Sequence, residues 1–357
     1  MTDLDALLRH LVETNGSDLV VKAGSPPHIR VDGRLVPAPF DAFDAASVPR
    51  LLDGVVPRVR AEELETTGET EFAHSVAGVG RFRVSAYRQR GSLALTCRRV
   101  VPGIPQHDEL GLPAVLDRLC AEGRGLVLVS GPASSGTTTT MCALVDHVNS
   151  TRSCHVLTIE NPIEYLHGDK RAIVSQREVG TDTMSVAAAT RRGSRQGVDV
   201  IAAGTVPDPE AMRALLDAAE AGALVFAVVP ALTGTEALVR LIEAFPEAER
   251  RRVRATLATV LRAVLCQRLL ERADGRGRVA AFEVLLGTTK ATDCIAEGRL
   301  DDLPQLIADG EYNGMQTLDL ALGNLARDGL VSVRDAVAAA DDAEELRLTL
   351  SGLSSSR

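Results

Sequence analysis

Length, composition and charge exclude several classes of function. The chain has 357 residues, enough for about two domains, and 45% of its residues are hydrophobic while only 3% are aromatic. The net charge of −9 and the shortage of aromatic side chains argue against nucleic acid as a partner. None of the six cysteines forms a CxxC pair, so a zinc site is not expected.

The sequence shows no segment typical of export or of a membrane span. The acidic, amphipathic N-terminus is unlike a signal peptide. The longest apolar run, residues 221–232, contains Gly222 and Pro230 and is too short to cross a bilayer. We therefore expect a cytoplasmic protein.

Residues 1–98 are expected to form a small α+β domain. Apolar spacing predicts a helix over residues 4–13. Alternating or apolar runs predict strands at residues 18–21, 29–31, 82–87 and 93–98, separated by Gly- and Pro-containing turns. The Pro-containing segment 101–105 is the best domain boundary, so residues 99–112 are interpreted as a linker.

In residues 113–350 the pattern changes to short apolar strands that alternate with amphipathic helices. Strands are predicted at residues 125–130, 155–159, 198–203 and 223–229, and helices at 139–149, 209–221 and 247–270. Near-continuous apolar strands are typical of a parallel sheet that is buried on both faces. Residues 300–350 are expected to be mostly helical, and residues 351–357 to form a disordered tail.

A glycine-rich loop after the strand at 125–130 has the spacing GxxxxGK[ST] of a phosphate-binding loop, except that Thr137 stands where the lysine belongs. The predicted nucleotide-binding residues are Gly131, Pro132, Ala133, Ser134, Ser135, Gly136, Thr137, Thr138 and Thr139. Such loops bind phosphate through backbone N–H groups at a helix N-terminus, and Thr138 occupies the position that would bind Mg²⁺. The alternative is a chance Gly/Ser/Thr turn between a strand and a helix.

Further motifs surround this loop in a defined order. They are GSDL at residues 16–19, PPHIRVDG at 26–33, RFRVSAY at 81–87, LTIENPIEY at 157–165 and GMQTLD at 314–319. Together they resemble the PilT-like type IV pilus retraction (twitching motility) ATPases of the type II/IV secretion ATPase superfamily. The resemblance implies an α/β fold with an N-terminal PAS-like α+β domain, a RecA-like P-loop NTPase core and a helical C-terminal segment. It also implies a homohexameric ring with ATP between the two domains.

The chain departs from this family at positions that perform the chemistry. Besides Thr137, Thr205 replaces the glutamate of the Walker B segment, and Pro230 stands where the family has a histidine. Asn161 replaces an aspartate in the acidic motif at 157–165. Because phosphoryl transfer depends on positioning and charge neutralisation, these losses together predict a pseudo-ATPase that keeps the fold and assembly but not turnover.

Two groups of retained residues are candidates for a remaining role. Glu160 is the best candidate to orient a water molecule; alternatively it binds Mg²⁺ or pairs with an arginine. By resemblance, four arginines are candidates to reach a nucleotide across a domain or subunit boundary, the alternative being a basic strand edge. They are Arg81, Arg83, Arg88 and Arg90.

The sequence thus favours a degenerate pilus or secretion motor subunit with weak ATP and Mg²⁺ binding and little or no hydrolysis, a structural or regulatory partner of an active ATPase. The expected partners are a homo- or hetero-hexamer with an ATPase paralogue and inner-membrane platform proteins, with the protein peripheral at the cytoplasmic face. The alternative is a functional hexameric ATPase that powers pilus retraction or secretion with an atypical phosphate loop. Ring stoichiometry, partner identity and the choice between retraction and secretion stay open.

Overall fold

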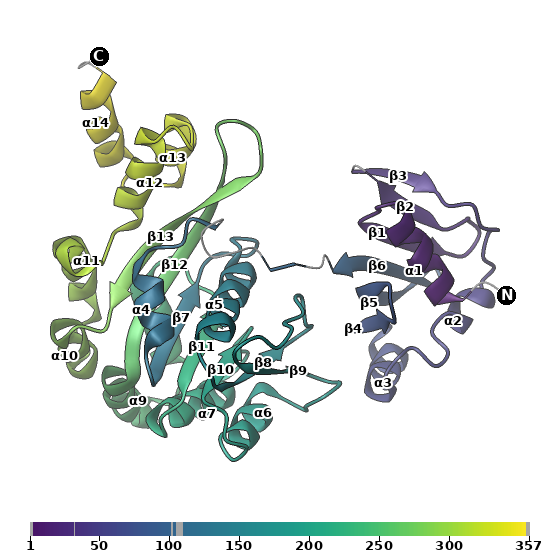
Figure 1. Ribbon diagram of the computed structural model, residues 1–357, viewed down its shortest axis with the longest axis horizontal. Coiled ribbons are helices and arrows are strands. Elements are labelled where there is room, and N and C mark those ends of the chain that lie inside the picture. The colour runs from purple at the N-terminus through teal and green to yellow at the C-terminus, as the bar shows by residue number, and fades with distance from the viewer. Residues whose placement is uncertain (1–2, 32, 101–102, 105–109, 355–357) are drawn as a thin grey trace. The chain divides into compact units, whose positions relative to one another are not determined.

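The computed structural model describes residues 3–31, 33–100, 103–104 and 110–354, which form two compact units (Figure 1). The first unit comprises residues 1–103 and the segments 161–166 and 178–184, and the second holds the remaining residues. The predicted boundary at 101–105 lies largely outside the described residues, as does much of the predicted linker. Arg99 and Val100, which the prediction places in that linker, instead complete strand β6 (Ser92–Val100).

The first unit is built on a six-stranded antiparallel sheet with the strand order β3-β2-β1-β6-β5-β4. Besides β6, its elements are α1 (Leu4–Glu13), β1 (Asp18–Lys22), β2 (His28–Val31), β3 (Arg34–Pro37), α2 (Ser47–Arg50), α3 (Arg58–Thr67), β4 (Glu69–Val76) and β5 (Gly80–Gln89). The prediction contains α1 and four of these strands but lacks β3 and β4. Every residue of β3 is exposed, and β4 buries few apolar side chains, so neither has a strong apolar pattern.

Regular apolar spacing explains the core of this unit. The leucines of α1 recur at helical spacing and are at most 1% exposed; they are Leu4, Leu7, Leu8 and Leu11. On β5 the buried residues alternate along the strand; they are Phe82, Val84 and Ala86. Because successive side chains of a strand point to opposite faces, Arg81 and Arg83 lie on the face away from this core.

The second unit contains a seven-stranded sheet with the order β13-β12-β7-β11-β10-β8-β9. Its strands are β7 (Gly125–Ser130), β8 (His155–Glu160), β9 (Ile173–Glu178), β10 (Val200–Ala203), β11 (Leu224–Val229), β12 (Leu261–Glu271) and β13 (Arg278–Leu286). Strands β7, β11, β10 and β8 run parallel, and all residues of β7 and β11 are buried. This confirms the predicted parallel sheet with both faces covered.

Helices follow the parallel strands as predicted, and others extend the fold beyond them. The helices that precede β12 in the second unit are α4 (Val115–Ala121), α5 (Thr137–Thr151), α6 (Val186–Gly193), α7 (Pro209–Glu220), α8 (Gly234–Glu243) and α9 (Glu247–Val260). None of the helices in the described part of the chain is both long enough and apolar enough to cross a membrane.

The predicted helix over 247–270 is wrong in its second half. Helix α9 ends at Val260, and Leu261 begins β12, which pairs in parallel with β7 and antiparallel with β13. The apolar residues of β12 fit a helical period as well as a fully buried strand, and periodicity alone does not separate the two. This strand turns out to line the phosphate loop.

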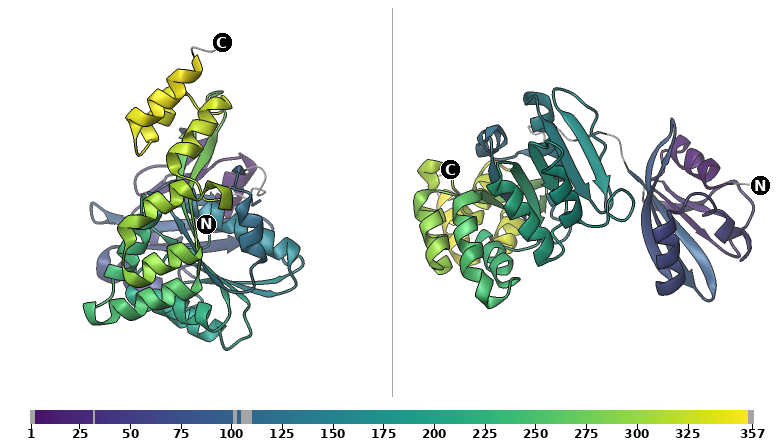
Figure 2. Two further views of the ribbon diagram at one scale, coloured as in Figure 1. Left: turned by 90° about the vertical axis from the view of Figure 1, so that its left-hand side faces the viewer. Right: turned by 90° about the horizontal axis from the view of Figure 1, so that it is seen from below.

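The C-terminal part is helical, as predicted, and appears in yellow-green to yellow in Figure 2. It consists of α10 (Thr289–Glu297), η2 (Leu300–Asp302), α11 (Leu303–Asp309), η3 (Glu311–Asn313), α12 (Leu318–Arg327), α13 (Val333–Ala339) and α14 (Ala343–Ser354). Helix α14 continues into the predicted disordered tail, so residues 351–354 are helical. Residues 355–357 of that tail lie outside the described residues.

Candidate nucleotide-binding site

The carboxyl ends of four parallel strands meet along one edge of the second unit's sheet. In spatial order, β7 ends at Ser130, β11 at Val229, β10 at Ala203 and β8 at Glu160. The phosphate loop, Pro230 and Thr205 directly follow the first three of these strands. The structure therefore places the predicted site residues of the core at the edge where parallel α/β sheets bind ligands.

The phosphate loop runs from Gly131 to Gly136 and leads directly into α5. A Cβ atom at Gly131 would lie 2.3 Å from Ser135 Oγ and 2.6 Å from the carbonyl oxygen of Gln267, so no larger residue fits there. Gly136 has a φ of +88°, in the left-handed region that favours glycine. Ser134 also has a positive φ, of 66°, and it therefore carries backbone strain.

The amino end of α5 has no side-chain cap, whereas Asp208 caps α7 and Thr233 caps α8. The first N–H groups of a helix have no acceptor inside the helix, so those of Thr137 and Thr138 can donate to a ligand. Ser135 is 3% exposed, and its Oγ has no hydrogen-bond partner among the described residues. These donors and the positive end of the helix dipole fit a phosphate group.

The first turn of α5 carries hydroxyl groups but no lysine. Thr137 and Thr138 are both half-buried there. A hydroxyl at Thr138 is the type of group that binds Mg²⁺ in phosphate loops, whereas Thr137 brings a neutral hydroxyl in place of a positive charge. The loop thus fits the binding of a phosphate group better than it fits stabilisation of the charge that develops during phosphoryl transfer.

Glu160 is held at the end of β8 by neighbouring donors. It is 3% exposed, and its Oε1 accepts hydrogen bonds from Thr158 Oγ1 at 2.6 Å and from Gln176 Nε2 at 3.1 Å. A Cβ atom at Gly204, just after β10, would lie 3.6 Å from Glu160 Cγ and 3.6 Å from Met141 Cε, so the side chains of Glu160 and of Met141 in α5 both approach Gly204. A role of Glu160 in orienting water stays a prediction.

Thr205 and Pro230 offer no acid–base chemistry at this edge. Thr205 is exposed, and its hydroxyl donates to the carbonyl of Gly204 at 2.7 Å. Pro230 is exposed, and its carbonyl accepts a hydrogen bond from Arg240 at 3.3 Å. Pro207, Pro230 and Leu241 help to line a mostly apolar pocket of about 210 Å³. The edge between β10 and β11 is therefore apolar where the resembled family is expected to carry catalytic side chains.

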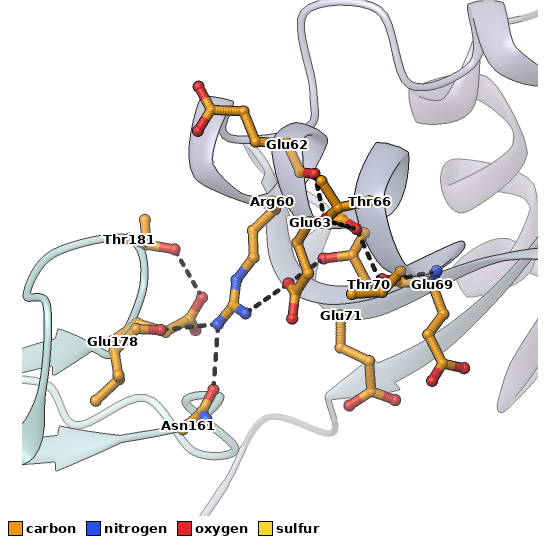
Figure 3. Close-up of polar contacts among 12 residues, drawn as sticks. Arg60, Glu62, Glu63, Thr66, Glu69, Thr70, Glu71, Asn161, Glu178 and Thr181 are labelled. Atoms are coloured by element: carbon orange, nitrogen blue, oxygen red, sulfur yellow. Dashed lines mark hydrogen bonds and ion pairs between the residues drawn. The ribbon is translucent and has the colours of Figure 1, made fainter.

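Asn161 has a structural contact in the first unit (Figure 3). Its Oδ1 accepts a hydrogen bond of 3.4 Å from Arg60, which also donates to the carbonyl of Val179 at 3.0 Å and pairs with Glu63 at 2.9 Å. Hydrogen bonds from Thr70 and then Arg60 lower the pKa of Glu63. Arg60 therefore fastens the segments at 161–166 and 178–184 to α3.

The four predicted arginines have different surroundings. Arg81 pairs with Glu178 at 2.7 Å, and both side chains are largely buried, at 16% and 2% exposed. Arg83 pairs with Glu71 at the surface, at 41% and 49% exposed. Arg88 and Arg90 are exposed at the end of β5 and in the turn after it. Contact of these arginines with a nucleotide stays a prediction, and for Arg81 the ion pair with Glu178 is the observed role.

Sequence reasoning missed Gln267 beside the phosphate loop, and it missed the roles of Arg60 and Glu178 within the first unit. Arg60 and Glu178 lie in segments with no apolar pattern that links them to each other. Gln267 lies in β12, which the prediction treats as a helix, so its place beside the phosphate loop was hidden. Pairing of β12 with β7 is the signal that reveals it.

Comparisons with known proteins agree with this arrangement. Residues 109–301 match the family model described as type II/IV secretion system protein. The chain is 38% identical to the type IV pilus ATPase PilU of Pseudomonas aeruginosa, over 98% of this chain and 91% of that protein. It is 36% identical to the type IV pilus retraction ATPase PilT of the same organism, over 94% and 97%.

Solved structures show the same similarity in three dimensions. The crystal structure of the pilus retraction motor PilT with bound ADP superposes with a TM-score of 0.87 at 36% identity, covering 97% of this chain and 99% of that one. The ATPase DotB of Legionella pneumophila shares the fold, with a TM-score of 0.85 at 23% identity over 98% and 95%. The predicted fold, an N-terminal domain followed by a RecA-like core, is confirmed.

Proposed function

Because the chain belongs to the type II/IV secretion ATPase family, in which its similar relatives are type IV pilus motors, we propose that it is a degenerate motor subunit. It binds ATP weakly and hydrolyses it little or not at all. The observation that carries the proposal is the phosphate loop. It has the glycines of the motif and an uncapped helix end, but Thr137 stands where the motif has its lysine.

Binding and hydrolysis place different demands on these residues. N–H groups of the loop and of the first turn of α5 would hold the phosphates, and the Thr138 hydroxyl would be a ligand for Mg²⁺. When bound, Mg²⁺ supplies part of the charge neutralisation. Hydrolysis further needs groups that orient water and stabilise new charge, and Thr205 and Pro230 supply neither.

The subunit acts in assembly with others, as a structural or regulatory partner of an active ATPase in a hexameric ring. This ring works on platform proteins at the cytoplasmic face of the inner membrane. Support comes from the full-length similarity to pilus motors. It also comes from the uncharged residues Thr137, Thr205 and Pro230 at the strand ends. ADP in the PilT structure supports a nucleotide as the ligand.

A slow but genuine pilus or secretion ATPase is the second candidate, favoured by Glu160. This carboxylate is buried and held by two hydrogen bonds beside the strand that ends at Ala203. In this case Glu160 orients water, and steady-state phosphate release by the purified chain exceeds background and is lost in Glu160→Gln. Turnover of this kind would overturn the pseudo-ATPase proposal.

Calorimetric titration with Mg-ATP and Mg-ADP tests nucleotide binding directly. We expect weak binding by the chain and at least tenfold tighter binding by Thr137→Lys, because the lysine restores one close charge-assisted contact worth about 1.5–3 kcal/mol. Thr151→Lys adds the same charge at the far end of α5 and serves as the control, with unchanged affinity. No binding by either the wild type or Thr137→Lys contradicts the proposal.

A further inference from the structure

Gln267 lies beside the start of the phosphate loop, because β12 runs parallel to β7 with Cys266 paired to Ser130. Its side chain is enclosed, at 3% exposed. A buried amide needs hydrogen-bond partners, and the partner described for this one is Thr140 of α5. Gln267 is therefore held by the helix whose amino end forms part of the candidate nucleotide site.

Three contacts connect Gln267 to both ends of the loop. A Cβ atom at Gly131 would lie 2.6 Å from the Gln267 carbonyl oxygen, and one at Gly136 would lie 3.0 Å from its Nε2. Gln267 Oε1 accepts a hydrogen bond from Thr140 Oγ1 at 2.6 Å. In turn, Thr140 N donates to the carbonyl of Gly136 at 3.0 Å, which completes a connection from β12 through α5 back to the loop.

We propose that Gln267 is the positioning residue of the phosphate loop. Its backbone packs against Gly131, its amide nitrogen faces Gly136, and its amide oxygen is held by Thr140. This arrangement holds the backbone between the two glycines, where the N–H groups of Ala133 and Ser134 can bind an anion while Ser135 N donates to the carbonyl of Pro132 at 3.1 Å. Because Thr137 provides no charge, anion binding depends on the directions of the backbone N–H groups. The loss of Gln267 therefore weakens binding more in this loop than it would in a phosphate loop that has a lysine. The ligand in this proposal rests on the proposed nucleotide binding.

The test uses the full-length chain, with Mg-ADP and inorganic pyrophosphate as probes. The variants are Gln267→Leu, Thr140→Val and the double variant, and each is followed by affinity, melting temperature and amide hydrogen exchange. Both single variants leave one buried polar partner unsatisfied, so we expect a lower melting temperature and about tenfold weaker binding of both probes. Exchange of the amides at 131–138 becomes faster, while that of α6 is unchanged.

Two controls separate positioning from packing. Thr190→Val removes a buried hydroxyl that bonds only to Val186 of its own helix, at 2.8 Å, so it lowers stability without changing affinity. The double variant removes both members of the Gln267–Thr140 pair and leaves no unsatisfied group, so it regains much of the lost stability. Its affinity stays low, because the connection to the loop is still missing.

The outcomes are distinct for the two proposals. If the double variant regains wild-type affinity together with stability, or if the single variants bind both probes normally, Gln267 only packs and the inference fails. If the wild type binds neither probe, the proposed nucleotide binding fails. In that case hydrogen exchange of the amides at 131–138 still tests the role of Gln267. Unchanged exchange in Gln267→Leu would contradict the proposal that Gln267 positions the loop.

Discussion

Ser134 has a backbone conformation that is unusual for a residue with a side chain, and it lies within the phosphate loop. Its φ of 66° lies in a region where a side chain costs about 1 kcal/mol relative to glycine. A strained residue persists only where the surrounding structure fixes it. The contacts at Gly131 and Gly136 on either side provide this constraint.

Replacing Ser134 by glycine is therefore expected to stabilise the protein, by up to about 1 kcal/mol in urea unfolding. Ser194, at the end of α6, has an ordinary helical φ of −57° and is the matched control. There the same substitution lowers stability, because glycine adds backbone freedom in the unfolded chain and removes the hydrogen bond from Ser194 Oγ to the carbonyl of Thr190 at 3.2 Å. Equal effects at both positions would contradict the assignment of strain to Ser134.

At this scale the sequence predicts the glycines of the loop but not Ser134 or Asn161. Glycine spacing has a direct conformational meaning, so Gly131 and Gly136 follow from the motif. The strain at Ser134 depends on tertiary contacts. Likewise, the hydrogen bond from Arg60 to Asn161 joins residues 101 positions apart, which no local pattern encodes.

At the scale of elements, strand β5 presents two Arg–Glu pairs in contrasting environments. The Arg81–Glu178 pair is largely buried, and Glu178 also accepts the N–H of Ile163 at 3.1 Å. The Arg83–Glu71 pair is about half exposed on both sides. The cost in stability of breaking each pair depends on its burial. An exposed charge that loses its partner is solvated by water, whereas a buried charge is left without compensation.

We expect Glu178→Gln to lower the free energy of unfolding by about 3–5 kcal/mol and Glu71→Gln by less than about 1 kcal/mol. Urea titration of both variants at the same salt concentration measures the difference. Raising the salt concentration should reduce only the smaller effect, because the surface pair is screened. A small loss in Glu178→Gln would show that Arg81 is free to serve another partner.

His167, between β8 and β9, makes stability depend on pH. Burial lowers its pKa to about 4 from an ordinary value near 6.5, and its Nδ1 has no hydrogen-bond partner among the described residues. The folded state therefore keeps the neutral ring while the unfolded chain gains a proton. Stability from this group is full above about pH 6.5 and falls until about pH 4.

In His167→Gln this contribution is absent, so the melting temperature of the variant should decline less than that of the wild type between pH 6.5 and 4. Carboxylates titrate near the lower end of this range in both proteins, and the difference between the two curves removes their effect. Parallel curves would show that His167 titrates normally in the fold.

The elements also show where prediction from sequence stops. Apolar spacing identifies α1 by its helical period, whereas the four parallel strands are identified as short apolar runs bounded by turn signals. It fails at β12, where a buried apolar run satisfies both periods, and at β3, whose residues are all exposed. Because β12 contains Gln267, the incorrect prediction of a helix there hides one residue that lies beside the phosphate loop.

For the whole molecule, the fold and the chemistry at the sheet edge have separate requirements. The chain has full-length similarity to pilus motors, and Thr137, Thr205 and Pro230 follow three neighbouring strand ends, where the proposal places the lost catalytic groups. Thr205 and Pro230 are exposed, so substitutions there are compatible with the fold. Catalytic groups act as a unit, and restoring one of several lost groups recovers little activity.

We therefore expect each of Thr137→Lys, Thr205→Glu and Pro230→His alone to leave phosphate release near background. The triple variant should exceed every single variant by at least about tenfold, because the groups act together. The melting temperature of each variant checks that it is folded. Full activity in Thr137→Lys alone would show that the other two positions do not limit turnover.

The uncapped amino end of α5 has a practical consequence for the choice of buffer. Phosphate and sulfate carry the charge and acceptors that this helix end lacks, so either ion in a purification buffer acts as a ligand of the folded state. Melting temperatures measured in phosphate and in an amine buffer are then not comparable. Preparations meant for titration with nucleotides belong in chloride, with the oxyanions removed beforehand.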